Sequence, residues 1–499
     1  MRNSPSSQAS IIAFPIPDPA IARHPDTLLN PRGLRRWIEE LPLANPPRAA
    51  QMLLQQIRML ARDPQPGPKL GALLELYLPA LEPLMRIALD RAATNADSAV
   101  PLDQLEHVLL EILAELAFGH LRIANDQLIS GKPASHDSLF RAMSLLESAK
   151  LIECLHYRRS ELQHWQLQLQ IFQLAEFQQI ASKRAGKPLG LDAQPDTIEG
   201  LFFRTLVVSL ADPNHHRPSQ VLSWLKWATQ HTHRLSLAVL PEGPFAIPVD
   251  VSGAQTPLQS ARRGKPGTDT RYLSTESFLQ ALNEDAQAPQ GLHQALDDLI
   301  RGRKSPEQRK SPRQQRNHPY RLLHGLRYIH NRLTELTQGD TRQSASTAPV
   351  ECLQINQSRS GAAFRLGMAP AQPLTVGEPV LLETDPASGQ GPPVGFAARI
   401  QRLVSDDAGE VEVGVQKLPG RLIPVTLTGK TTQRARGDIE ALLQEAEDGK
   451  YTLIMTRRVY RAGELLTVES ANARYSLRLG ELQASTQRCA YADAESVDA

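Results

Sequence analysis

The sequence predicts a multidomain α+β protein, in which an N-terminal all-α helical region is followed by a C-terminal β-barrel with added β strands. Its 499 residues suffice for roughly two to four domains, each with a core of its own. Apolar residues recur with helical spacing over most of residues 26–300. After residue 350, short alternating runs separated by turn residues predominate, which is typical of β structure.

The start of the chain, residues 1–25, is rich in serine and proline and is expected to form a flexible leader. Prolines interrupt its apolar residues around Phe14, so it does not resemble a secretory signal. No apolar run approaches the length of a membrane span. Together with three cysteines that lack any paired spacing, this predicts a protein of the reducing cytoplasm without a disulfide framework.

Residues 26–185 are predicted to form a helical bundle. Asn30-Pro31 and Asn45-Pro46 each place a capping side chain before a first-turn proline, as at the start of a helix. The other helices are expected at 67–93, where Pro79 and Pro83 break or kink the helix, and at 101–129, 139–155 and 161–180.

A loop rich in glycine and proline at 182–196 marks a possible boundary. The next region, 197–300, is predicted to be mainly helical and is either a separate domain or a continuation of the bundle. Its helices are expected at 197–210, 218–232, 275–282 and 292–300, and its extended segments at 235–240 and 245–251. Trp224 and Trp227, three residues apart on one helix, are expected to fill a core or a helix-packing surface.

The last region, 429–499, is predicted to be a β-rich extension that either lengthens the preceding barrel or packs on it as a small subdomain. Strands are expected at 423–428, 451–460, 464–469 and 474–482, and a helix at 438–446.

One polar turn lies between two expected strands, 350–355 and 362–366, and has the pattern Asn356-x-Ser358-x-x-Gly361. Asparagine offers both a donor and an acceptor, serine offers a hydroxyl, and glycine permits positive φ and close approach of a ligand. Such a turn can hold the polar edge of a base. It can also hold only itself, because Asn and Ser bond their own backbone in ordinary turns.

Three further segments follow this turn in order: Pro373-Leu374-Thr375-Val376-Gly377-Glu378, then Gly395-Phe396-Ala397-Ala398-Arg399-Ile400, then Gly414-Val415. With them, residues 301–428 resemble the PilZ domain, the bacterial receptor module for cyclic di-GMP. The resemblance implies a small β-barrel on which Asn356, Ser358 and the Gly361 backbone hold part of a guanine.

The resemblance also implies an Arg-x-x-x-Arg element upstream, which Arg309 and Arg313 supply. These arginines would grip guanine edges and phosphates, and guanidinium groups suit both. However, 42 residues separate Arg313 from Asn356, which is longer than is usual in the family, so Arg316 or Arg321 is an alternative to Arg313. The extra length includes an expected strand and helix at 319–336.

The net charge of +2 provides no global attraction to nucleic acid or membrane, and the positive charge is local. Residues 301–332 contain ten Lys or Arg and one acid, Glu307. Such a block is either a phosphate-binding segment or a solvated basic linker. Nucleic-acid binding through it is disfavoured, because only Tyr320 and Tyr328 are interleaved with the basic residues.

Two other kinds of site are set aside. His215-His216 and His231-x-His233 have no carboxylate or cysteine at a familiar ligand spacing, so no metal site and no cofactor are expected. No stretch combines a nucleophile, a base and an electrostatic stabiliser, so an enzyme is the least supported class.

The sequence therefore predicts a bacterial cyclic di-GMP receptor. Nucleotide binding would order the arginine-rich segment and alter the contacts of the helical region with an unknown protein partner. The alternative is a PilZ-like scaffold that does not bind nucleotide and acts through protein–protein contacts.

Overall fold

The computed structural model describes the chain with gaps. The described residues are 13–64, 69–94, 103–159, 162–186, 189, 196–263, 267, 269–289, 291–304, 314–338, 349–367, 370, 372–384, 395–406, 409–428, 439–446, 449–471 and 473–497.

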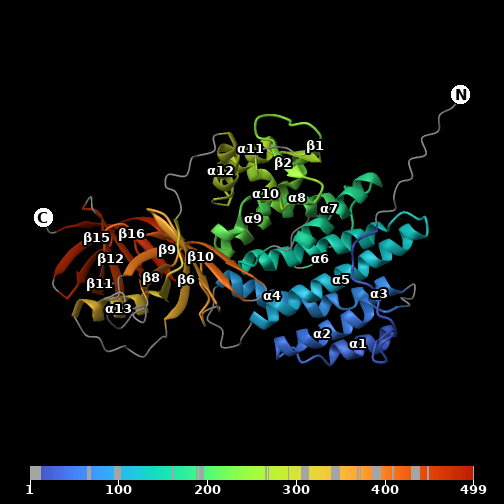
Figure 1. The fold of residues 1–499 in the computed structure, drawn as a ribbon, viewed down its shortest axis with the longest axis horizontal. Helices are drawn as coiled ribbons and strands as arrows, with labels where there is room; N and C mark the ends of the chain where they lie inside the picture. Colours follow the sequence, from blue (N-terminus) through green and yellow to red (C-terminus); the bar gives the residue numbers. More distant parts are fainter. Residues whose placement is uncertain are drawn as a thin grey trace. The chain divides into compact units, whose positions relative to one another are not determined.

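The chain divides into two compact units, whose elements are labelled in Figure 1. The first comprises Met1–His156, Ser160–Pro213 and Pro218–Pro306. The second comprises Tyr157–Arg159, Asn214–Arg217 and Glu307–Ala499.

The first unit is mainly helical. Its helices are α1 (Pro31–Glu39), α2 (Pro46–Ala61), α3 (Leu70–Glu75), α4 (Leu78–Thr94), α5 (Asp103–Ile129), α6 (His136–Leu155), α7 (Leu162–Phe177), α8 (Ile198–Leu210), α9 (Pro218–His231), α10 (Pro257–Arg263), α11 (Glu276–Glu284) and α12 (Leu292–Lys304). A small antiparallel sheet accompanies them, with β1 (Ser236–Ala238), β3 (Thr270–Ser274) and β2 (Ile247–Asp250) in that order.

The helix starts at Asn30 and Asn45 are confirmed. The Asn30 side chain accepts from the Arg32 N–H, and the Asn45 side chain accepts from the Arg48 N–H, each beside a proline in the first turn. The expected helix at 67–93 is two helices: Pro79 lies in the first turn of α4, after the break that follows α3, whereas Pro83 lies further inside α4.

The helices of 26–185 and those of 197–300 share one hydrophobic core. Within it, α5 packs on α2 and α6, and α6 packs on α8. Trp224 and Trp227 are buried in this core, as predicted. Phe172 of α7 stacks on Phe202 of α8 with ring centroids 4.1 Å apart.

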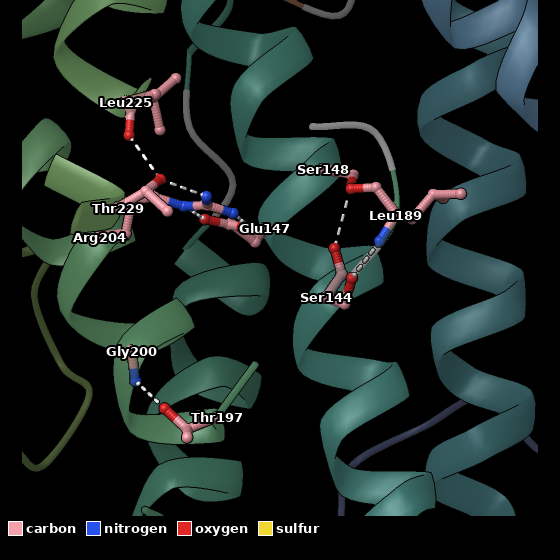
Figure 2. A network of polar contacts seen from close by, with 9 residues as sticks. All are labelled: Ser144, Glu147, Ser148, Leu189, Thr197, Gly200, Arg204, Leu225 and Thr229. Atoms are coloured by element: carbon pink, nitrogen blue, oxygen red, sulfur yellow. Dashed lines mark hydrogen bonds and ion pairs between the residues drawn. The ribbon is translucent and has the colours of Figure 1, made fainter. Parts of the chain in front are cut away.

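A buried ion pair also links three of these helices (Figure 2). Arg204 on α8 donates to both carboxylate oxygens of Glu147 on α6, and its third nitrogen donates to Thr229 Oγ1 on α9 at 2.6 Å. Nearby, Ser144 Oγ accepts from the Leu189 N–H at 2.8 Å, and Ser148 Oγ lies 3.2 Å from the Leu189 carbonyl oxygen. These contacts satisfy polar groups that burial would otherwise leave without partners.

The second unit is mainly β structure. Its strands are β4 (Gln314–Gln315), β5 (Pro319–His324), β6 (Val350–Gln357), β7 (Gly361–Leu366), β8 (Pro379–Thr384), β9 (Gly395–Ser405), β10 (Val411–Lys417), β11 (Arg421–Thr428), β12 (Ile439–Glu445), β13 (Tyr451–Thr456), β14 (Leu465–Glu469), β15 (Arg474–Ser485) and β16 (Cys489–Ser496). One helix, α13 (Leu326–Gln338), lies between β5 and β6 in the chain.

Six of these strands close into a first barrel, since β5, β6, β7, β10, β9 and β8 pair in sequence and β8 pairs back to β5. The short strand β4 pairs with β6 just beyond the end of β5. Leu322, Phe364, Ile400 and Val413 contribute to the core inside this barrel.

The remaining strands form a second closed barrel in the order β11, β12, β13, β16, β15, β14. The predicted helix at 438–446 is wrong, because the structure has strand β12 there. Ala441 and Leu443 point into the core of the second barrel, whereas Leu442 belongs to a different apolar cluster on its outside. A strand buried on both faces has a continuous apolar run and loses the alternation that marks a strand.

Tyr157, which follows α6 in the chain, also belongs to the second unit and is buried in the core of the first barrel. The Val376 N–H donates to its hydroxyl at 3.3 Å, and its carbonyl oxygen accepts from the Ser405 N–H at 2.7 Å. Its φ of 55° is unusual for a residue with a side chain.

The predicted fold class is thus confirmed: a multidomain α+β chain with a helical region followed by β-barrels.

Candidate functional site

The polar turn that the sequence singled out joins β6 to β7 on the first barrel. Ser358 closes it: its N–H donates to the Gly361 carbonyl at 2.8 Å, and its Oγ accepts from the Gly361 N–H at 3.2 Å. From the other side, the Lys417 N–H donates to the Ser360 carbonyl at 2.9 Å. The serine hydroxyl therefore holds the shape of the turn.

Gly361 is needed for a close approach of backbone to backbone. It is not in the left-handed region, so the positive φ that glycine permits is not used here. A Cβ at this position would lie 2.6 Å from the carbonyl oxygen of Val415 on β10. Gly361 therefore allows the close approach of strand β10, where the sequence pattern predicted the close approach of a ligand.

Asn356 lies near the end of β6, beyond a register shift that follows Gln354. Its neighbours across the ladder are Gln315 on β4 and Ala363 on β7. Gln354 is buried, and Asn356 is opposite Ala363, which lies between the barrel-core residues Ala362 and Phe364. Asn356 therefore faces outward, and its amide has no hydrogen bond to any residue within the described ranges.

The chain upstream of β5 runs directly past this turn. Gln314 pairs with Gln357, Gln315 pairs with Asn356, and the Arg316 N–H donates to the Ile355 carbonyl at 3.1 Å. Arg309 and Arg313 lie outside the described residues, but Gln314 is the residue that follows Arg313. The 42 residues between Arg313 and Asn356 therefore do not require a large distance in space, because β4, which directly follows Arg313, pairs with the end of β6.

The two alternatives to Arg313 differ in position. Arg316 is exposed next to β6, and its guanidinium donates to Gln314 Oε1 at 2.8 Å. Arg321 is paired with Glu351, five residues along β6 from Asn356, or about 16 Å at the usual rise of a strand. Only Arg316 is close to the turn.

A row of ladder neighbours with two small residues, Ala363 and Gly414, extends from Asn356 across the outer face of the barrel. Ala363 on β7 is opposite Asn356, Gly414 on β10 is opposite Ala363, and Arg402 on β9 is opposite Gly414. Three strand spacings separate Asn356 from Arg402, no more than about 14 Å. Space at Gly414 is tight, because a Cβ there would lie 3.3 Å from the Arg402 Cβ.

Arg402 is the candidate residue that the sequence did not reveal. It is exposed, and no other described residue forms an ion pair or hydrogen bond with its side chain. Its position opposite Gly414 depends on a register shift between Gly414 and Val415, which cannot be read from the sequence. Gly414 itself was visible as part of the Gly-Val element.

Aromatic side chains support this region from inside the barrel. Tyr320 packs edge-on against Phe364 with ring centroids 5.3 Å apart, and Phe396 lies beside both. Lys417, next to the turn, places its Nζ 4.8 Å from the centre of the Phe396 ring. Rings locked in this way restrict the strands on which the turn is built.

Residues 32–242 match the model of a protein family described as the N-terminal domain of the cyclic-di-GMP receptor FimW. This stretch, about two fifths of the chain, is therefore similar to the N-terminal domain of that family. The family's description names a receptor for cyclic di-GMP, which is the receptor class expected from the sequence. No curated protein matches the chain.

The matched range covers most of the helical unit, from α1 to the segment after β1, and ends before either barrel begins. The comparison therefore concerns the helical unit and the class of receptor to which the matched family belongs. The residues proposed to contact nucleotide lie outside the matched range.

Other kinds of chemistry have little support in the described part of the chain. It contains no group of three or more His, Cys, Asp or Glu side chains placed to share a metal ion. Burial raises the pKa of Cys352 and Cys489 to about 12 and that of Cys154 to about 11, so these thiols stay protonated at neutral pH and are weak nucleophiles. None of the helices described is both long enough and apolar enough to cross a bilayer.

Proposed function

We propose that the chain binds cyclic di-GMP on the outer face of the first barrel, beside the β6–β7 turn, and passes this event to a protein partner through the helical unit. The observation that supports the site most directly is the pairing of Gln315 with Asn356. It brings the chain that follows Arg313 next to the Asn-x-Ser-x-x-Gly turn.

Each residue of the turn has a separate role in this proposal. The outward amide of Asn356 reads the edge of a guanine, since it offers both a donor and an acceptor. Ser358 and Gly361 keep the turn pressed against β10, so that its backbone groups are presented in one arrangement.

The arginines supply the charge. Arg309 and Arg313 bind phosphate oxygens or the O6 and N7 atoms of guanine, for which a guanidinium fork is suited. Arg402 lies next to Gly414, at the end of the row opposite Asn356, and offers a third guanidinium to the nucleotide.

The route to the helical unit is through the chain itself. Arg309 follows the end of α12 at Lys304 by only five residues, so fixing Arg309 on the barrel constrains the end of that helix. Tyr157, held in the core of the first barrel, follows the end of α6 by two residues. Binding alters the contacts of the helical region with a partner through these connections.

Limited trypsin digestion of the full chain tests this mechanism. Saturating cyclic di-GMP should slow cleavage at the basic residues of 303–316 at least tenfold, while cleavage after the exposed Arg36 on α1 provides the control and should not change. If cleavage within 303–316 is equally fast with and without nucleotide, the proposed ordering of this segment is wrong.

A further inference from the structure

The two barrels have the same strand order. Numbered one to six along the chain, β5 to β10 pair in the order 1-2-3-6-5-4 and close back to 1. Strands β11 to β16 pair in the same order and close in the same way. All of these pairs are antiparallel. The second barrel therefore has a β12–β13 turn at the place where the first has its Asn-x-Ser-x-x-Gly turn.

The equivalent turn lacks the side chains of the candidate site. Ladder pairs Gln444–Thr452 and Glu445–Tyr451 correspond to Asn356–Ala363 and Gln357–Ala362 of the first barrel. Gln444 thus stands at the position of Asn356, but its Nε2 donates to the Pro419 carbonyl at 2.9 Å. Ala446 stands at the position of Ser358 and has no hydroxyl.

The charge of this turn is also reversed. From the last residue of β12 the sequence runs Glu445-Ala446-Glu447-Asp448, where from the last residue of β6 it runs Gln357-Ser358-Arg359-Ser360. Carboxylates at this place repel the phosphates of a cyclic dinucleotide.

The second barrel also has no counterpart of the arginine-rich segment that precedes β5 in the first barrel. Only Leu418, Pro419 and Gly420 connect β10 to β11, and none of them is basic. Gly420 is in the left-handed region with φ of 76°, and any side chain there would run into the backbone of Glu445. The segment that precedes β11 is therefore pressed against the turn.

The outer face of the second barrel is instead buried by other parts of the same unit. Leu442, Ile454 and Tyr491 share an apolar cluster with Ile329 of α13 and Leu381 of β8. α13 runs along strands of both barrels (Figure 1).

Polar contacts join the same three parts. Arg332 of α13 donates to Glu383 of β8 at 2.9 Å, and Arg327 of α13 lies 3.7 Å from Glu440 of β12. Arg399 of β9 stands over the ring of Tyr491 at 5.6 Å from its centre. The contact surface is therefore continuous from the first barrel through α13 to the second.

We infer that the second barrel is a docking module and not a second receptor, and that its partner is the nucleotide-binding barrel of the same chain, with α13 between them. The statement that the second barrel docks on the first rests only on the contacts described above. The statement that only one barrel takes nucleotide rests on the proposed function.

Hydrogen exchange on the full chain without nucleotide tests the docking. Ile454→Ala should speed exchange of the α13 amides at least tenfold, whereas Leu465→Ala, at a position of the same barrel that is 53% exposed, should leave them unchanged. The β15 amides report whether the second barrel stays folded, and Ile454→Val replaces the variant if they too exchange rapidly. Unchanged α13 exchange with an intact second barrel would overturn the docking.

Hydrogen exchange with saturating cyclic di-GMP tests whether the β12–β13 turn of the second barrel binds nucleotide. Slower exchange is expected for peptides spanning 314–318 and 356–361, with no change for 444–452. Protection of 444–452 would overturn the inference. Protection of neither barrel would contradict the proposed function and would agree with a second barrel that binds no nucleotide.

Discussion

Gly361 belongs to the Asn-x-Ser-x-x-Gly motif, but the packing of the barrel alone explains why a glycine is needed there. Gly361→Ala would push a methyl group against the Val415 carbonyl, and we expect a loss of about 1–3 kcal/mol of unfolding free energy, as for other overpacked positions. Urea denaturation of the full chain measures this. Gly367→Ala is the matched control, because no described residue other than its chain neighbours has an atom within 4 Å of the Cβ it would add. Equal stability of the two variants would contradict the close approach.

His324, at the end of β5, gives the fold a dependence on acid. Burial, and to a smaller extent the charge of the nearby Arg488, lower its pKa to about 4, and its buried Nδ1 has no hydrogen-bond partner among the described residues. The unfolded chain binds a proton near pH 6.5 and the folded chain does not, so this residue's contribution to stability is complete above that pH and is lost as the pH falls towards 4.

The pH prediction is best tested as a difference. Between pH 7 and pH 4.5 the chain should lose about 2 kcal/mol more unfolding free energy than a His324→Gln variant does. Taking the difference cancels other acid-sensitive groups, such as the buried His120, whose pKa burial lowers to about 3. Parallel loss in both proteins would show that His324 is not buried in its neutral form.

Among single residues, the sequence predicted the polar turn itself but not the residues that lie beside it in the folded barrel. The pattern of Asn356, Ser358 and Gly361 is local, and local hydrogen bonding of Ser358 follows from it. The proximity of Gln315 and Arg402 depends on strand register, which is set by contacts between residues far apart in the chain.

Among the elements, helices α6, α8 and α9 depend on the pair of Glu147 and Arg204, both buried in the helical unit. Glu147→Leu leaves a buried guanidinium without its counter-charge and should cost about 3–5 kcal/mol of unfolding free energy. The double variant Glu147→Leu/Arg204→Met removes both charges and should cost less than Glu147→Leu alone. Thermal and urea unfolding measure both. A double variant as unstable as the sum of the two single variants would contradict this account of the pair.

The long helices and the strands around the polar turn were predictable, whereas a strand buried on both faces was not. The caps at Asn30 and Asn45, the strand and helix at 319–336 and the two strands that flank the polar turn were predicted correctly from periodicity and turn residues. β12 was mistaken for a helix, because the second barrel buries one of its faces and α13 helps to bury the other. β16 was not predicted.

For the whole molecule, composition and periodicity were sufficient for the α+β class and for a helical region preceding β structure. They did not reveal the second closed barrel. Closure depends on pairs such as β11 with β14 and β13 with β16, which join strands distant in the sequence. The FimW-type match over residues 32–242 adds the receptor class, which helical periodicity alone could not supply.

The central claim is that the first barrel binds cyclic di-GMP between the upstream arginines and Asn356. Calorimetric titration of the full chain tests it most directly, beside the variants Arg309→Ala/Arg313→Ala and Asn356→Ala. Arg474→Ala, on the exposed surface of the second barrel, is the control. We expect binding by the unaltered chain and the control, and an affinity about 100-fold lower or worse for the double variant, since each lost charge-assisted hydrogen bond is worth about 1.5–3 kcal/mol. Equal affinity in all four proteins would contradict the site, and no binding by any of them would leave a PilZ-like scaffold that acts through protein contacts.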